Sequence, residues 1–319
     1  MTAATGGAAQ IVPRSGHPRV VVWMVAAYNL VLIGRWAPLV PQYEAARWLV
    51  VVHGIAPGLP LLLARAPAPG QSWLRRVYDF YPLAWICAFW RELDVHGRFI
   101  SNLPNDRALA WLDHAVFGAH LNVAWLQALP GRGFSEMMHL LYFLYYPLLF
   151  VVPLLLVLAT RGAVRREGVL RIATAYLACF LVYALWPTSG PVFLHVTFPE
   201  SVSGGLVFRL NHLIQASGDS LGTAFPSSHV AGSVTLTWIL WRMGYRGLGA
   251  VGIAITLGVL GATIYTQNHF AVDSLAGLAF AVSIQALVVP QLLPEGAGTV
   301  VGSVEQPRIY IQPAREAAA

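Results

Sequence analysis

Long apolar segments separated by short polar stretches run along most of the chain. A helix needs about 20 consecutive apolar residues to cross the roughly 30 Å hydrocarbon core of a bilayer. The apolar runs predict eight membrane-spanning helices, at residues 18–38, 46–64, 77–92, 136–159, 169–187, 225–243, 247–267 and 270–290. The run at 77–92 is short and contains Asp79 and Pro82, so a re-entrant or interfacial helix is the alternative there.

Composition favours a membrane protein over a large soluble one. Of the 319 residues, 57% are hydrophobic and 11% are charged, whereas soluble domains carry about 25% charged residues. The net charge of +6 is spread over short loops, which indicates membrane topology and contact with anionic lipids rather than binding of nucleic acid. Cys87 and Cys179 lie inside apolar runs, so we expect neither a disulfide framework nor a cysteine metal site. The expected fold class is an all-α, multi-pass transmembrane helical bundle.

Arginines set the expected orientation. The stretch 161–171 holds four Arg, and 242–246 holds two. With eight membrane-spanning helices, these two stretches lie on the same side of the membrane as residues 65–76 and the N-terminus. The positive-inside rule predicts that this side is cytoplasmic. The stretches 93–134 and 188–224 then lie outside. The expected regions are a disordered tail (1–17), N-terminal membrane helices with an outer segment (18–135), a catalytic helical core (136–290) and a disordered cytoplasmic tail (291–319).

Two polar clusters stand at the outer ends of neighbouring apolar runs: "FPSSH" at 225–229 and "NHFAVD" at 268–273. On a helix, His269 and Asp273 would share one face, and a carboxylate one turn from an imidazole fixes its tautomer. Serine hydroxyls and the free N–H groups of a first helical turn bind anions. An anion site, an oriented histidine and a second histidine, His229, favour phosphoryl transfer without metal.

The order "FPSSH" and then His-x-x-x-Asp resembles the type 2 phosphatidic acid phosphatase superfamily. "IYTQNHFAVDSLAG" is similar to its aureobasidin-resistance branch, which includes inositol phosphorylceramide synthases and bacterial relatives. "LWPTSGPVF" at 185–193 and "DRALAWLDHAVFG" at 106–118 resemble further elements of that branch. The resemblance covers about residues 70–290 and implies a six-helix phosphatase-type core.

The resemblance also implies residue roles. His269 is the expected nucleophile, Asp273 its partner, and His229 the general acid and base. Ser227 and the neighbouring backbone are expected to bind phosphate. Ser228 stands where the phosphatases usually have glycine, and we expect it to bind substrate beside Ser227.

One element of the resembling proteins is missing. Relatives often hold arginine at the positions of Val192 and Thr263, yet phosphoryl transfer needs positive charge near the phosphate oxygens. Arg209, in the outer stretch before the serine motif, is the first expected replacement. Arg98 and Arg107 are the next.

The expected function is that of a lipid phosphatase or phosphotransferase with a phosphohistidine intermediate. It would act on a phospholipid, sphingolipid or polyprenyl phosphate at the outer face of the cell membrane, with no cofactor or metal. Hydrolase and transferase chemistry both remain open, as does the oligomeric state. A transporter or lipid flippase with a His/Asp proton relay is an alternative, although transporters place such groups near the bilayer midplane. A haem or metal protein using His229 and His269 would need neither the serine pair nor Asp273.

Overall fold

The computed structural model describes residues 17–56, 58, 72–99, 103–160, 162–191 and 197–293. Across these residues the secondary structure is helical apart from one isolated bridge between Thr188 and Thr223, which confirms the all-α fold class. The tails expected at 1–17 and 291–319 lie outside the described residues, except for His17 and residues 291–293.

The described part of the chain consists mainly of helices. Their bounds are α1 His17–Trp36, α2 Glu44–Ile55, α4 Ser72–Phe99, α5 Leu103–Phe117, α6 Leu121–Ala128, α7 Arg132–Phe143, α8 Tyr145–Ala159, α9 Gly162–Leu185, α10 Glu200–Ser203, α11 Leu206–Gly218, α12 Ser228–Arg242, α13 Arg246–Tyr265 and α14 Ala271–Ser283. A 3₁₀ turn, η1 (Ala37–Leu39), follows α1, and a π-helical turn, η3 (Ile284–Val288), joins α14 to α15 (Val289–Leu292).

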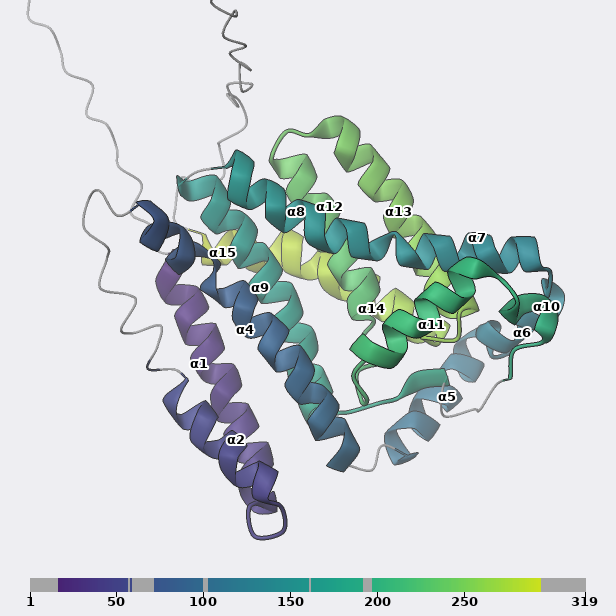
Figure 1. The fold of residues 1–319 in the computed structure, drawn as a ribbon, viewed down its shortest axis with the longest axis horizontal. Coiled ribbons are helices and arrows are strands. Elements are labelled where there is room, and N and C mark those ends of the chain that lie inside the picture. The colour runs from purple at the N-terminus through teal and green to yellow at the C-terminus, as the bar shows by residue number, and fades with distance from the viewer. Residues whose placement is uncertain are drawn as a thin grey trace, which may run out of the picture.

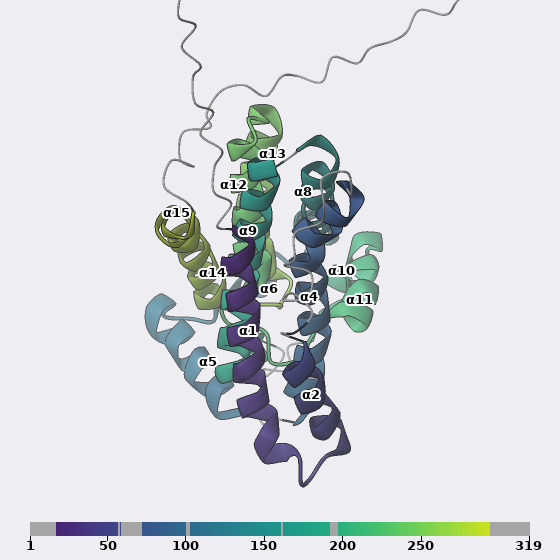
Figure 2. The same ribbon diagram turned by 90° about the vertical axis from the view of Figure 1, so that its left-hand side faces the viewer.

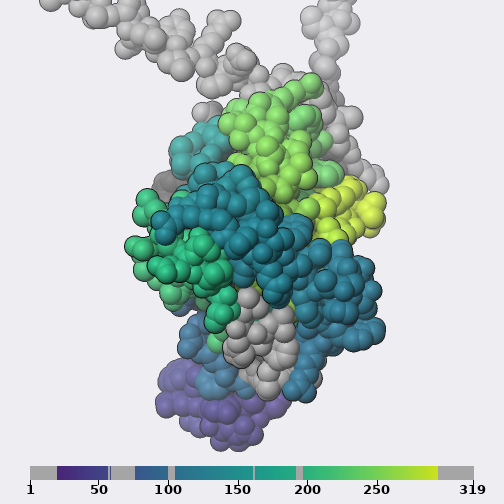
Figure 3. Space-filling model, turned by 90° about the vertical axis from the view of Figure 1, so that its right-hand side faces the viewer, coloured from purple at the N-terminus to yellow at the C-terminus, as the bar shows by residue number. Residues whose placement is uncertain are grey.

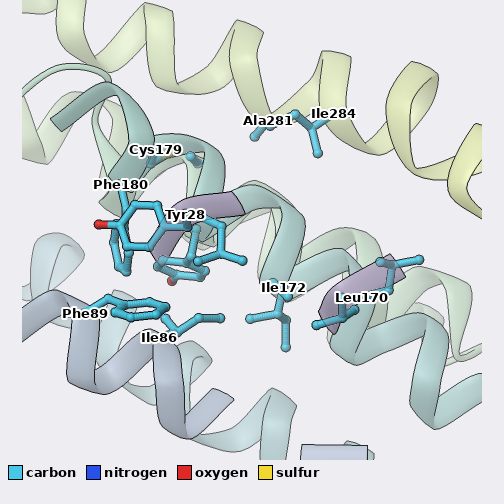
Figure 4. Close-up of a cluster of buried hydrophobic side chains, with 14 of the residues drawn as sticks. Tyr28, Ile86, Phe89, Leu170, Ile172, Cys179, Phe180, Ala281 and Ile284 are labelled. Atoms are coloured by element: carbon cyan, nitrogen blue, oxygen red, sulfur yellow. The ribbon is translucent and has the colours of Figure 1, made fainter. Parts of the chain in front are cut away.

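Helix α9 is the centre of the bundle. It packs against α1 and α4 on one side and against α12 on the other, and α12 in turn packs against α13 and α14. Figures 1 and 2 show α1, α2 and α4 as a unit beside this core. Their shared core includes Tyr28, Phe89 and Phe180 (Figure 4). The N-terminal helices are therefore joined to the core through a continuous apolar contact.

Among the described residues, fewer than the eight expected segments are long and apolar enough to cross a membrane. These five are Val20–Leu39, Arg132–Ala159, Gly162–Leu185, Arg246–Tyr265 and Ala271–Leu292. By contrast, α2 has 12 residues and α12 has 15. Helix α12 is short because Ser227 caps its start and Gly244, at φ 81, lies in the turn after its end. The stretch expected at 77–92 is part of the 28-residue α4, which continues through Pro82.

The arginine-rich stretch 161–171 is largely the start of a helix rather than a loop. Helix α9 begins at Gly162, before the expected boundary at 169. Arg165 is buried and its Nε donates to Asp79 of α4 at 2.7 Å. Arg171 is also buried and donates to Glu167 at 2.9 Å. Ionisable side chains at membrane depth need such partners, and pairing explains why this charged sequence is helical.

Candidate active site

Three loops meet at one end of the bundle. Figures 1 and 2 show this end opposite the turn between α12 and α13. The loop after α9 runs beside the loop before α12, since Thr188 N–H donates to Gly222 O at 3.2 Å and Ala224 N–H donates to Thr188 O at 2.8 Å. The third loop joins α13 to α14 and carries His269, whose N–H donates to Thr263 O at 3.0 Å.

The predicted catalytic residues lie together in one chain of contacts. Nε2 of His269 lies 3.4 Å from Nδ1 of His229. On its other side, Nδ1 of His269 lies 3.7 Å from Oδ2 of Asp273. Nε2 of His229 is 2.8 Å from the hydroxyl of Tyr142. The order is therefore Asp273, His269, His229 and Tyr142.

One arrangement of protons satisfies the two hydrogen bonds of this chain, at 2.8 and 3.4 Å. Tyr142 donates to Nε2 of His229, His229 carries its proton on Nδ1, and His269 carries its proton on Nδ1, facing Asp273. The electron pair on Nε2 of His269 then faces the proton on Nδ1 of His229. Such a pair of histidines can attack an electrophilic centre and protonate a leaving group.

His269 and Asp273 do not share a helical face, contrary to the expectation. His269 lies in the turn before α14, and Asp273 lies in the first turn of that helix. Asp273 Oδ2 accepts from the Phe270 N–H at 2.8 Å, so the carboxylate also caps α14. The 3.7 Å gap to His269 is longer than a hydrogen bond. Catalytic hydrogen bonds are often this long before substrate binds.

The turn that carries His269 is held by a buried amide pair. Gln267 has φ 63, a left-handed conformation unusual for a residue other than glycine. Its side chain accepts from Asn122 Nδ2 at 2.6 Å and donates to Asn122 O at 2.7 Å. Such conformations persist when surrounding contacts fix them. Helix α6 thereby sets the position of His269.

The two serines occupy the N-terminus of α12. Ser227 is fully buried and caps the helix, with its hydroxyl accepting from Val230 N–H at 3.4 Å. Its own N–H donates to Asp273 O at 3.0 Å. A Cβ at Gly277 would lie 2.4 Å from Ser227 O, so this glycine permits the close approach of α14. Ser228 is also buried, and neither serine is among the residues that line the pocket.

A pocket of about 230 Å³ opens beside the two histidines. Half of its ten other lining residues are neutral and polar. The full lining consists of Trp90, Ser189, Gln215, Asp219, Ser220, Leu221, Gly222, Thr223, Ala224, His229, Asn268 and His269. Gln215 donates to Asn268 Oδ1 at 2.9 Å, which joins α11 to the His269 loop. No arginine is part of this lining, and Asp219 is its one carboxylate.

Burial shifts the pKa values of all three titrating groups that line the pocket, and it lowers the pKa of His229 to about 3. Removal from water lowers the pKa of His269 to about 4 and raises the pKa of Asp219 to about 7. Each shift favours the neutral form. His269 is therefore an unprotonated base at neutral pH, and Asp219 changes charge there.

The arginines expected to supply positive charge do not line the pocket. Arg209 is exposed on α11. Arg98 is bound to Asp94, with Nη2 at 3.0 Å from Oδ2, and Arg107 is exposed on α5. Thr263 is fully buried and its hydroxyl lies 2.9 Å from that of Ser274. Val192 lies outside the described residues.

Three contributors to the site were not identified from the sequence: Tyr142, Tyr145 and Asp106. Tyr142 and Tyr145 are both buried, and the ring of Tyr145 lies 4.8 Å from that of His229. A buried tyrosine hydroxyl needs a partner, which is the signal that could have singled out Tyr142. Asp106 accepts from the N–H groups of Ser189 and Gly190 at 2.6 and 3.0 Å. This bond ties α5 to the loop after α9.

In the described part of the chain, no group of three or more His, Cys, Asp or Glu side chains is arranged to hold a metal ion.

The apolar helices define a membrane protein, and the histidine pair with its pocket suits phosphoester chemistry. The sequence matches the PAP2 superfamily over residues 107–287. The chain belongs to this superfamily, whose members are phosphoesterases, and is an enzyme of the phosphatase type. Searches of curated proteins and of solved structures gave no match.

Proposed function

We propose that this protein cleaves or transfers a phosphate or phospho-head group on a lipid at the outer face of the cell membrane. The substrate is a phospholipid, a sphingolipid or a polyprenyl phosphate, and no metal takes part. The observation that carries the proposal is the 3.4 Å contact between Nε2 of His269 and Nδ1 of His229 at the wall of a pocket. The superfamily match does not single out a branch. A relation to the inositol phosphorylceramide synthases is part of this proposal.

The reaction follows from the atoms in that contact. The negative charge of the bound phosphate favours a doubly protonated His229. Nε2 of His269 attacks phosphorus, and the bond from phosphorus to the leaving oxygen breaks as His229 gives that oxygen its Nδ1 proton and becomes neutral. His229 then removes a proton from water or from an acceptor hydroxyl, whose oxygen attacks the phosphohistidine and releases His269. Asp273 stabilises the charge that His269 acquires. Water gives a phosphatase, and a lipid or sugar hydroxyl gives a transferase.

Phosphate binding is assigned to the N-terminal turn of α12. The N–H groups at a helix start point outward and attract anions, and His229 itself belongs to this turn. Ser227 and Ser228 support this turn. Because the side chains of both serines are buried, we propose that they act by shaping the backbone rather than by touching phosphate with their hydroxyls.

The arginine distribution supports the outer-face orientation. Arg242 and Arg246 flank the turn after α12, at the end of the bundle opposite the site. Basic residues favour the cytoplasmic side, which leaves the site outside. A site at one end of the bundle also does not favour the transporter alternative, in which such groups lie near the midplane.

The proposal is tested by assaying the purified protein against phosphatidic acid, ceramide phosphate and a polyprenyl phosphate. Each assay is run with and without inositol and sphingoid acceptors, with and without EDTA, and the products are identified by mass spectrometry. We expect turnover of at least one lipid, unaffected by EDTA, and an acid-labile phosphoenzyme. His269→Ala should abolish both turnover and phosphoenzyme, since loss of a covalent nucleophile costs several orders of magnitude. Activity of this variant near that of the wild type would overturn the mechanism.

A further inference from the structure

Helix α4, which lies outside the region matched to the superfamily, contacts the loop that forms one side of the pocket. The indole Nε1 of Trp90 donates to Gly218 O at 2.8 Å. In return, the hydroxyl of Ser220 donates to the main-chain oxygen of Trp90 at 2.7 Å. These two bonds join α4 to the residues that precede and follow Asp219 in the chain.

Three further contacts extend this attachment along α4. Arg91 Nη1 donates to Ser217 O at 3.3 Å, and Leu221 N–H donates to Asp94 Oδ1 at 3.4 Å. At Gly97 a Cβ would lie 2.2 Å from Leu221 O, so only glycine allows the loop to approach the helix this closely. We refer to Trp90, Arg91, Asp94 and Gly97 as the α4 clamp. It fixes residues 217–221 of the pocket loop.

Trp90 is the member of the clamp that reaches the pocket. It lines the same cavity as His229 and His269. Its ring packs toward Phe180 of α9, with ring centroids 5.9 Å apart. The side chain is thus held by a hydrogen bond at its polar end and by an aromatic neighbour, so it forms a rigid wall.

The size of the cavity makes this wall important. Drug-sized ligands occupy about 300–1,000 Å³, and the pocket measures about 230 Å³. It therefore has room for a phosphate and a small part of the group attached to it. We propose that Trp90 limits the width of the leaving group or acceptor that can lie beside the two histidines. This inference rests on the proposed function, because it takes the pocket as the reaction site.

The test compares two aryl phosphates of different width, phenyl phosphate and 1-naphthyl phosphate, as substrates of the detergent-purified protein. Their leaving groups have similar acidity, so the ratio of their kcat/KM values reports mainly on fit. We expect Trp90→Ala to shift this ratio toward the naphthyl ester by about 10-fold or more, on the scale of pocket discrimination by size. Trp90→Phe keeps an aromatic wall and should keep this ratio within about threefold of the wild-type value. The same variant loses the hydrogen bond to Gly218, which should lower kcat for both esters alike.

Trp85→Ala is the matched control. Trp85 lies on the same helix, but its ring stacks on Phe89 at 5.5 Å and is not part of the pocket. This variant should leave the ratio of the two esters unchanged. Should Trp90→Ala fail to fold, Trp90→Leu gives the same comparison with more of the side-chain volume retained.

The results separate the two proposals. If the ratio for a folded Trp90→Ala or Trp90→Leu variant equals that of the wild type while His269→Ala is inactive, the role of Trp90 is wrong and the proposed function stands. If His269→Ala hydrolyses both esters as fast as the wild type, the proposed function itself fails. A shift with Trp85→Ala equal to that with Trp90→Ala would also overturn the inference, since the effect would then belong to the helix as a whole.

Discussion

The hydroxyl of Tyr142 lies 2.8 Å from Nε2 of His229, and the two residues are 87 positions apart in the chain. Tyr142 is fully buried in α7. This contact turns His229 so that its other nitrogen, Nδ1, faces His269. A side chain on an apolar helix thus decides which nitrogen of the proposed acid takes part in the reaction.

Replacement of Tyr142 by phenylalanine should lower kcat. A neutral hydrogen bond contributes about 1 kcal/mol, so we expect roughly a 5- to 10-fold loss on a lipid substrate, with little change in KM. Tyr145→Phe is the control, because its ring also contacts His229 while its hydroxyl bonds to Tyr176 at 2.7 Å instead. Equal losses in the two variants, measured by steady-state kinetics, would contradict the role given to Tyr142.

His229→Ala should affect substrates according to their leaving groups. An alkyl alkoxide needs a proton as it departs, whereas an activated aryl oxide such as 4-nitrophenolate does not. We expect the variant to lose far more activity on phosphatidic acid than on 4-nitrophenyl phosphate, in the range of about 10²–10⁴-fold for general acid catalysis. The measurement is the phosphoenzyme formation rate on each substrate. The same loss on both would argue against His229 as the acid.

The pH dependence should show two separate limbs. Attack requires unprotonated His269, and because burial lowers the pKa of His269 to about 4, activity should persist through pH 5–6 and fall only as the pH approaches 4. Asp219, with its pKa raised to about 7, becomes negative above that pH and repels an anionic substrate. KM should therefore rise above pH 7.

Asp219→Asn provides the control for the second limb. This variant should lose the rise in KM above pH 7 and keep the fall in activity near pH 4. The experiment is a pH–rate profile of both proteins with one phosphodiester substrate whose own charge stays constant over the range. A rise in KM of the same size in the variant would show that another group causes it.

Arg209→Ala should retain at least half of the wild-type activity. Arg209 was the first arginine expected from the sequence to bind phosphate, but its side chain is exposed on α11 and does not line the pocket. Exposed side chains away from a site usually have small effects. A loss of activity of about 10²-fold is the scale of removing one transition-state donor. Such a loss would show that Arg209 binds the phosphate and imply that α11 moves when substrate binds.

The orientation can be tested by cysteine labelling of intact cells. In a Cys87→Ala background, a cysteine at Ser203 in α10 should react with a membrane-impermeant maleimide, whereas one at Gly162, at the start of α9, should not. Cys179 is buried and can stay as the internal control. Labelling at Gly162 alone would reverse the orientation and place the site in the cytoplasm.

The sequence by itself determined the class of the protein and singled out the two histidines that we propose to react. Apolar runs and a low charged fraction require an all-α membrane bundle, since only regular hydrogen bonding satisfies the backbone in lipid. The two motifs, "FPSSH" and His-x-x-x-Asp, identified His229 and His269, which the structure places 3.4 Å apart. Such information is local, because a motif is a short run of residues and a membrane span is one continuous apolar run.

The tertiary structure decided which distant residues complete the site. Tyr142, Asp219 and Trp90 come from three different helices or their ends, and no periodicity along the chain relates them to His229. The same limit made the sequence favour Arg209 because it is near the serine motif in the chain, although Arg209 does not line the pocket. The start of α9 shows a further limit: Arg165 reads as a loop residue until its partner, Asp79, is known to lie 2.7 Å away. Contacts between helices depend on packing in three dimensions, and the desolvation and hydrogen bonding they create are what set the chemistry of the site.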